Sequence, residues 1–109
     1  MSMRKIDKSE CESYFNTLSK ALQDKMAEIE IMAMGTMDKK QTHWIKINGI
    51  SYNPEEDVLF IFCENLEHRI KKALEFKVWG TDDSVDKVEI VGSDGYSHLL
   101  TFKNPVKLS

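Results

Sequence analysis

The sequence predicts an α+β fold in which an N-terminal amphipathic helix packs on a curved antiparallel sheet of five or six strands. Two observations lead to this prediction. Residues 7–22 carry an apolar stripe at helical spacing, whereas strand-like alternation of apolar and polar residues fills most of the chain after them. The connections between the strand-like segments are short, which favours antiparallel pairing of neighbouring strands as a meander.

The helix is marked at its start and along one face. Asp7 can cap the N-terminus with Glu10 three residues later, and Ile6 can pack on Cys11 as a hydrophobic staple. Ser9 with Glu12 offers a second register for the same cap, two residues further on. The apolar stripe consists of Cys11, Tyr14, Phe15, Leu18 and Leu22. One stripe means one buried face, and that face is expected to lie on the sheet.

Six later segments have the composition of strands: residues 26–34, 44–52, 58–63, 68–79, 85–91 and 96–103. Asn48-Gly49 could form a hairpin turn, but a continuous strand with a bulge at Gly49 is preferred, because the hairpin would leave too short a strand before the turn at residues 53–57. Gly92–Gly95 predicts the last hairpin loop, and Asn104-Pro105 is expected to end the sheet.

The segment 58–63 is apolar on both faces, so it is expected to be the central or most enclosed strand. In the segment 68–79, the positions expected to point inward are Ile70, Leu74, Phe76 and Val78. The predicted core consists of Phe15, Leu18, Ile29, Ile31, Phe60, Phe62, Phe76, Ile90, Leu100 and Phe102.

Apolar residues also lie on the second face of the sheet, which a single helix on the first face cannot cover. They include Met32, Met34, Trp79 and Leu99. Either the sheet curls into a small barrel that encloses these residues, or they meet another chain. In the second case the four residues form an interaction face, towards an unidentified protein partner or a second copy in a homodimer.

Composition narrows the classes of function. A chain of 109 residues is long enough for one domain, residues 1–109, and its 41% hydrophobic and 30% charged content is that of a soluble globular protein. The net charge of −3 argues against general attraction to nucleic acid or to anionic lipid. No apolar run could span a membrane, and no secretory signal follows the N-terminus. Together with two thiols, Cys11 and Cys63, that are expected to stay reduced and unbridged, this predicts the cytoplasm and no membrane partner.

The sequence shows no constellation of catalytic, cofactor-binding or metal-binding residues. The three histidines, His43, His68 and His98, lie on separate predicted elements and lack the spacing of metal ligands. The five glycines are scattered singly, so no phosphate-binding loop is present. An enzymatic function would require His68 to lie in a closed pocket. The expectation is therefore a protein that is not an enzyme and that carries neither a cofactor nor a metal.

One alternative is a small-barrel protein that binds single-stranded nucleic acid. The outward face of the segment 68–79 would supply Arg69, Lys71, Lys77 and Trp79, and basic groups beside an aromatic ring suit such binding. However, residues 64–80 contain four basic and three acidic residues, a net charge of only +1. A solvated face is the simpler interpretation, so nucleic acid is not the expected partner.

Motifs that carry a family resemblance run along nearly the whole chain. They are Ile6, Tyr14-Phe15-Asn-Thr-Leu18-Ser19, Gly49-Ile50-Ser51, His68-x-Ile70, and Ser93-Asp94-Gly95 followed by Leu99-Leu100-x-Phe102. With these motifs the sequence resembles domain-of-unknown-function family 5335, which consists of short stand-alone bacterial proteins. The motifs are core positions, a turn and a strand, so the resemblance implies a bacterial protein but brings no activity, cofactor or catalytic residue. The sequence therefore favours a non-enzymatic binding or interaction module.

Overall fold

One helix and nine strands form the part of the chain that the computed structural model describes, namely residues 2–22, 25–33, 39–41, 45–64, 67–93 and 95–108. In chain order they are β1 (Ser2–Lys5), α1 (Lys8–Leu22), β2 (Lys25–Ala33), β3 (Lys39–Gln41), β4 (Ile45–Asn53), β5 (Val58–Cys63), β6 (Glu67–Lys71), β7 (Glu75–Gly80), β8 (Ser84–Val91) and β9 (Tyr96–Lys107). The predicted α+β class is confirmed. Within these ranges, no helix has the length and apolar character needed to cross a membrane.

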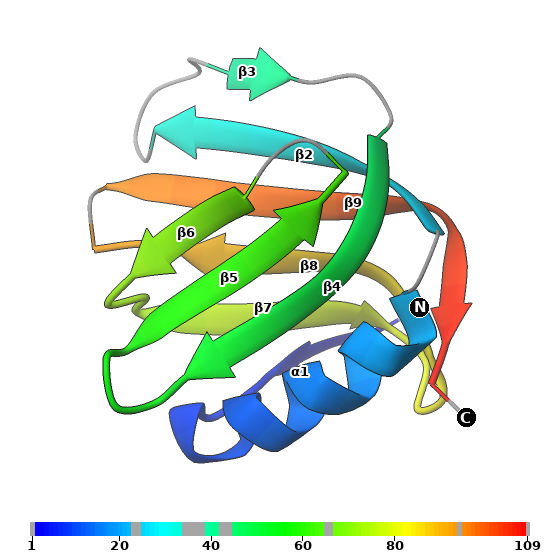
Figure 1. The fold of residues 1–109 in the computed structure, drawn as a ribbon, viewed down its shortest axis with the longest axis horizontal. Coiled ribbons are helices and arrows are strands. Elements are labelled where there is room, and N and C mark those ends of the chain that lie inside the picture. Colours follow the sequence, from blue (N-terminus) through cyan, green and yellow to red (C-terminus); the bar gives the residue numbers. More distant parts are fainter. Residues whose placement is uncertain are drawn as a thin grey trace.

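All nine strands belong to one antiparallel sheet with the order β1-β7-β8-β9-β2-β4-β5-β6, and β3 pairs with β2. The sheet folds over, so that β4, β5 and β6 form one layer, β1 and β7–β9 form the other, and β2 joins them (Figure 1). Each layer contains a three-stranded meander, as the short connections predict. Among the described strands, β1 and β6 each pair on one side only. The sheet is therefore strongly curved but is not closed into a barrel.

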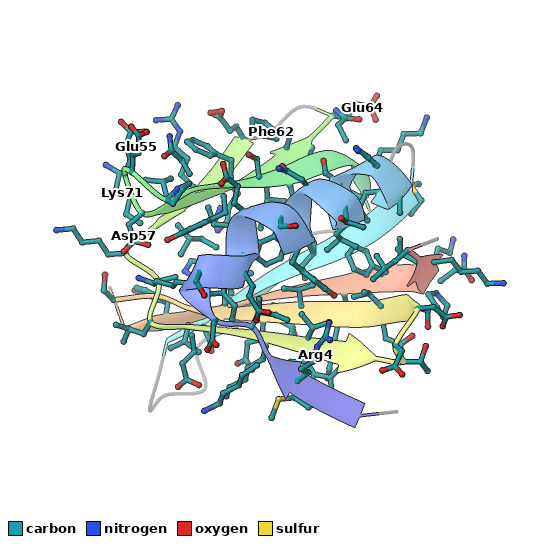
Figure 2. All side chains as sticks on the ribbon, turned by 90° about the horizontal axis from the view of Figure 1, so that it is seen from below. Arg4, Glu55, Asp57, Phe62, Glu64 and Lys71 are labelled. Atoms are coloured by element: carbon teal, nitrogen blue, oxygen red, sulfur yellow. The ribbon has the colours of Figure 1, made fainter. Side chains whose placement is uncertain are left out.

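The helix α1 lies across the gap between the two layers and packs mainly against β4 (Figures 1 and 2). Of the predicted stripe, Tyr14 is half-buried and the fully buried members are Cys11, Phe15, Leu18 and Leu22. The helix begins at Lys8, directly after Asp7, whose carbonyl accepts a hydrogen bond from the N–H of Glu10 at 2.9 Å. The predicted bounds of the helix and its buried face are confirmed.

The second half of α1 comes close to β4 at Gly49. A β-bulge between Ile47 and Gly49 shifts the register of β4 against β5, which confirms the continuous strand predicted here. The hydroxyl of Ser19 on α1 accepts a hydrogen bond from the N–H of Ile50 at 3.1 Å. A Cβ added at position 49 would lie 2.6 Å from the Oγ of Ser19. Glycine therefore allows the helix and the strand to make this contact.

The core lies between the two layers and beneath α1. The β7–β9 layer contributes Phe76, Val78, Val85, Val88, Ile90, Leu100, Phe102 and Val106, and the β4–β6 layer contributes Ile47, Ile50, Tyr52, Leu59, Ile61, Cys63 and Ile70. The predicted core positions Phe15, Leu18, Phe76, Ile90, Leu100 and Phe102 are confirmed. Ile29 and Ile31 lie outside the side chains that the structure describes.

The pleat of β5 is the reverse of the predicted one. Leu59 and Ile61 point into the core, whereas Phe60 is half-buried and Phe62 is 38% exposed. The prediction that both phenylalanines are buried is therefore wrong. Alternation could not decide which face points inward, because every residue of this strand is apolar.

The predicted strand 68–79 is in fact two strands, β6 and β7, which lie in different layers (Figure 1). The chain turns between them at Lys72, which has a φ of 52° and whose N–H donates to the carbonyl of Asp57 at 2.7 Å. Leu74, predicted to point inward, is 64% exposed in this turn. The turn contains neither glycine nor proline, so the usual signal for a turn is missing from the sequence.

At its C-terminal end, β9 continues past Asn104-Pro105 to Lys107, so the expectation that the sheet ends at this proline is wrong. Val106, beyond the proline, is buried and pairs with Val85 of β8. The register between β8 and β9 is irregular in this stretch. Proline is tolerated there because it interrupts no regular ladder of hydrogen bonds.

Candidate functional site

The reversed pleat of β5 places two aromatic rings on the outer surface of the β4–β6 layer. The rings of Phe60 and Phe62 are nearly parallel, with 7° between their planes and 5.9 Å between their centroids. The guanidinium of Arg69 on β6 lies 5.8 Å from the centroid of the Phe60 ring. We call Phe60, Phe62, Glu67, Arg69 and Lys71 the aromatic face. Figure 2 shows Phe62 on the side of its layer that points away from β7–β9.

The aromatic face carries charges of both signs. The Nε and Nη2 atoms of Arg69 both donate to the Oε2 of Glu67, at 3.1 and 3.0 Å. Both side chains are well exposed, so this ion pair adds little to stability. In this arrangement the guanidinium lies beside the Phe60 ring. Of the three charged residues that define the aromatic face, Lys71 is the one outside this ion pair.

The predicted nucleic-acid face is divided between the two layers. Arg69 and Lys71 lie on β6 at one edge of the sheet, whereas Lys77 and Trp79 lie on β7, which is next to β1 at the other edge. On β7, the Nζ of Lys77 is 4.0 Å from the Oε1 of Glu89. Because the turn between β6 and β7 carries the chain from one layer to the other, the four residues do not form one surface.

Two residues of the predicted interaction face lie on the outer surface of the β7–β9 layer. Trp79 and Leu99 are half-buried there, and the strand β8 separates them. Trp79 pairs with Lys87, whose Nζ is 4.7 Å from the centroid of the indole, and Leu99 pairs with Glu89. The two methionines of the predicted face lie outside the side chains that the structure describes. The interaction face stays a prediction, and charged residues interrupt its described part.

Two histidines meet between the layers, at positions that the sequence did not link. The Nε2 of His68 on β6 is 3.0 Å from the Nδ1 of His98 on β9, with ring centroids 5.0 Å apart. His98 is buried and His68 is half-buried. β6 and β9 are not neighbours in the sheet, so this hydrogen bond connects the two layers directly. His43 lies outside the described residues.

A second polar cluster ties the start of α1 to the turn between β4 and β5. The hydroxyl of Tyr52 donates to the Oδ1 of Asp57, and the Nζ of Lys8 donates to the Oδ2, each at 2.7 Å. The hydrogen bonds from Lys8 and then from Tyr52 lower the pKa of Asp57. Burial, followed by the bond to Asp57, raises the pKa of Tyr52 to about 12. This cluster links secondary-structure elements and therefore has a structural role.

Neither cysteine has the character of a nucleophile. Cys11 and Cys63 are free and buried, as predicted. Burial raises the pKa of the Cys11 thiol to about 12 and also raises the pKa of the Cys63 thiol, so both stay protonated at neutral pH. Among the described residues, no three histidine, cysteine or acidic side chains gather closely enough to hold a metal ion.

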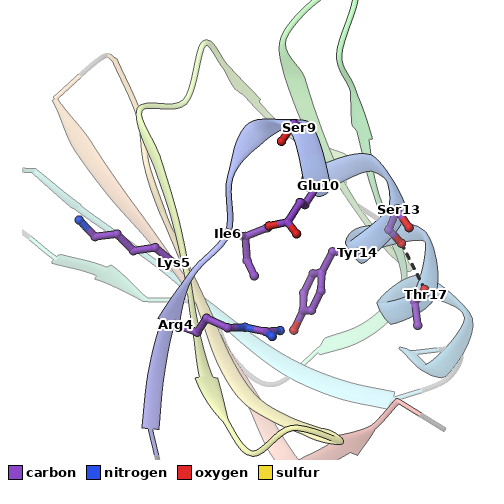
Figure 3. A pocket seen from close by; sticks show the side chains of 8 residues that line it. All are labelled: Arg4, Lys5, Ile6, Ser9, Glu10, Ser13, Tyr14 and Thr17. Atoms are coloured by element: carbon purple, nitrogen blue, oxygen red, sulfur yellow. Dashed lines mark hydrogen bonds between the residues drawn. The ribbon is translucent and has the colours of Figure 1, made fainter.

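A groove of about 440 Å³ runs between β1 and α1 (Figure 3). The guanidinium of Arg4 lies 5.5 Å from the centroid of the Tyr14 ring and reaches towards the phenol oxygen. Burial raises the pKa of Tyr14, and the interaction with Arg4 opposes that rise. The groove also contains Glu10 and Lys5, and the Nζ of Lys5 is 3.1 Å from the Oε2 of Glu75. Because it offers both signs of charge, the groove selects neither anions nor cations.

Comparisons with known proteins agree with the resemblance seen in the motifs. Residues 2–109 match a family of unknown function, DUF5335. An uncharacterised protein of Aquifex aeolicus (strain VF5) is 29% identical over 109 residues, which cover 99% of this chain and 98% of that protein. No solved structure matches the chain. The chain therefore belongs to the DUF5335 family, whose function is unknown, and it has a bacterial relative that matches it from end to end.

Proposed function

We propose that this protein is a non-catalytic binding module that docks another protein on its aromatic face. The observation that carries the proposal is the orientation of β5. Its inner positions Leu59 and Ile61 are aliphatic, and both of its phenylalanines point outward, with Phe60 beside Arg69. Aromatic residues and arginine are enriched at the centres of protein interfaces, where a few such side chains supply most of the binding free energy.

Contacts within the aromatic face favour one arrangement of its side chains before any partner arrives. The Phe60 and Phe62 rings support each other, and Glu67 holds the guanidinium of Arg69 in place through two hydrogen bonds. Side chains that are already fixed lose little conformational entropy on binding, so more of the contact free energy appears as affinity.

The charges on this face favour a protein over a nucleic acid as the partner. A polyanion would be held by several cations free to neutralise phosphates. Here Arg69 is already paired with Glu67, and only Lys71 remains. A protein surface can place an acidic group opposite Lys71 and polar groups opposite the Arg69–Glu67 ion pair. Such matching of charges gives an interface its specificity.

The chemistry of the described residues supports a role without catalysis. Both thiols are buried and protonated, and the two described histidines are joined to each other by a hydrogen bond. The groove beside α1 contains neither a histidine nor a cysteine. Binding is therefore the activity that the arrangement of side chains favours.

The test compares two exposed apolar residues, one on the aromatic face and one away from it. Phe62→Ser removes a ring from the face, whereas Leu74→Ser removes an apolar side chain of similar or greater exposure in the β6–β7 turn. Wild type and both variants are used to capture partners from a lysate of the source bacterium, and captured proteins are purified and titrated directly. We expect Phe62→Ser to weaken a specific protein partner by at least about tenfold, while Leu74→Ser binds as the wild type does.

Equal binding by the wild type and Phe62→Ser would overturn the proposal. Two further measurements test whether a nucleic acid or a second copy of the chain binds the aromatic face instead. Salt-sensitive binding of an oligothymidine that weakens in Arg69→Gln would favour nucleic acid instead. A mass in light scattering that doubles with concentration for the wild type, but not for Phe62→Ser, would identify a second copy of the chain as the occupant.

A further inference from the structure

We infer that the His68–His98 pair is a pH-sensitive clasp that holds β6 against the β7–β9 layer and so controls the order of the aromatic face. The part that concerns partner binding rests on the proposed function. The clasp itself is a property of the fold and can be tested without a partner.

The clasp lies directly behind the aromatic face. On β6, the inward-pointing His68 alternates with the outward-pointing Glu67 and Arg69. Arg69 pairs in register with Phe60, and Glu67 pairs with Phe62. A displacement of β6 would therefore move the charged half of the aromatic face away from its two rings.

The hydrogen bond between the rings depends on how many protons the pair carries. At 3.0 Å, one of the two facing nitrogens must donate and the other must accept. A neutral pair meets this requirement, and so does a pair that has taken up one extra proton. A second extra proton turns both facing nitrogens into donors and places two positive rings in contact. Imidazole is the side chain that ordinarily titrates between about pH 5 and 8, so lowering the pH moves the pair towards this state.

The strands around the pair present apolar neighbours to it. In register, Ile61 of β5 lies beside His68, and Ile90 of β8 lies beside His98. Ile61 and Ile90 are buried. Surroundings of low polarity make a doubly charged pair more costly than it would be in water.

The titratable and charged groups on the strands around the histidine pair lie either on the inner faces, which they share with the pair, or on the outer faces. Cys63 of β5, whose thiol is protonated, and Tyr96 of β9 share the inner faces with the pair by strand alternation. Glu67 and Arg69 of β6, and Glu89 of β8, alternate with inward residues and belong to the outer faces. The charged side chains on the described parts of these strands therefore point away from the pair.

β6 has little else to hold it in place from inside. It is a five-residue edge strand that, among the described strands, pairs with β5 only. Apart from the half-buried His68, its one buried side chain is Ile70. Loss of the clasp is therefore expected to release β6 locally, while α1 and β4 stay closed.

Amide hydrogen exchange measured by NMR between pH 7.5 and pH 5.5, corrected for the intrinsic pH dependence, tests the clasp. We expect the protection of the β6 amides to fall by at least about tenfold relative to those of β4 as the pH is lowered. In His68→Gln the side-chain amide can still donate to the Nδ1 of His98 but does not titrate, so this pH dependence should disappear. Equal pH dependence in both proteins, or none in the wild type, would overturn the clasp.

A second measurement covers the case in which His68→Gln does not fold. The imidazole carbon-bound protons of the wild-type protein are followed by NMR over the same pH range. A clasp requires the two rings to titrate as a coupled pair, with the second proton uptake accompanied by changes in the β6 amide signals. Two independent single-step titrations with unchanged β6 signals would contradict it. Either readout can fail while Phe62→Ser still weakens partner binding, so the two proposals fail separately.

Discussion

The two openings between the layers of this sheet are closed by different kinds of interaction. On one side, α1 fills the gap with the fully buried side chains of Phe15, Leu18 and Leu22. On the other side, β6 approaches β9 through the hydrogen bond between His68 and His98. Apolar burial contributes free energy that does not depend on protonation, whereas an imidazole pair contributes only in some of its protonation states. The same fold thus has one permanent closure and one conditional closure.

The contrast predicts its largest effect at the helix. Phe15→Ala should lower the free energy of unfolding by about 3–5 kcal/mol, because it leaves a cavity between α1 and the core. Urea unfolding followed by circular dichroism measures the change. Thr17→Ala, on the exposed side of the same helix, is the control and should change stability by less than about 0.5 kcal/mol. A small loss for Phe15→Ala would mean that the helix does not close the core.

A smaller effect separates the two faces of β5. Leu59→Ala should cost about 2–5 kcal/mol, because Leu59 is fully buried. Phe60→Ala removes more atoms but from a half-buried outer position, so its cost should be only about 1 kcal/mol. Denaturant unfolding of the two variants under the same conditions gives the comparison. If Phe60→Ala costs more than Leu59→Ala, the pleat of β5 is the one that the sequence predicted.

The smallest effect concerns the polar link at the start of α1. Asp57→Asn keeps a residue that tolerates the positive φ of 54°, but it removes the charge that binds Lys8, so a loss of about 1 kcal/mol at pH 7 is expected. The hydrogen bonds lower the pKa of Asp57 in the folded state. Its contribution is therefore present above the ordinary pKa of a carboxyl group and is lost as the pH falls through the lowered folded-state value. The stability difference between wild type and variant, measured by urea unfolding, should shrink as the pH falls below the ordinary carboxyl pKa of about 4; a difference that grows in acid would contradict the link.

The closure by α1 could be predicted from the sequence, because local patterns of residues determine it. The stripe at Phe15, Leu18 and Leu22 repeats at helical spacing, and a single amphipathic helix has one face to bury. The bulge at Gly49 was also predicted, since a glycine within a long strand pattern is a local signal. These features depend on residues close together in the chain.

The arrangement of β5 and β6 could not be predicted from the sequence, because packing between distant parts of the chain determines it. Every residue of β5 is apolar, so alternation gave no information about which face points inward. The turn at Lys72 lacks glycine and proline, so the sequence pattern predicts a continuous strand there. This pattern places Arg69 and Trp79 on one face, although the fold separates them into two layers. The contact between His68 and His98 joins residues thirty positions apart on strands that do not pair, and no sequence spacing reports such a contact.

Native-state hydrogen exchange at pH 7 in low concentrations of denaturant compares the two closures most directly, since it gives the free energy of opening for each amide. The account predicts that amides of α1, such as those of Phe15 and Leu18, exchange only through global unfolding. The amides of β6 that pair with β5, such as that of Ile70, should open at a free energy lower by at least about 1 kcal/mol, independently of denaturant. If β6 and α1 open together at the global free energy, the two sides are equivalent and the conditional closure at His68 and His98 is contradicted.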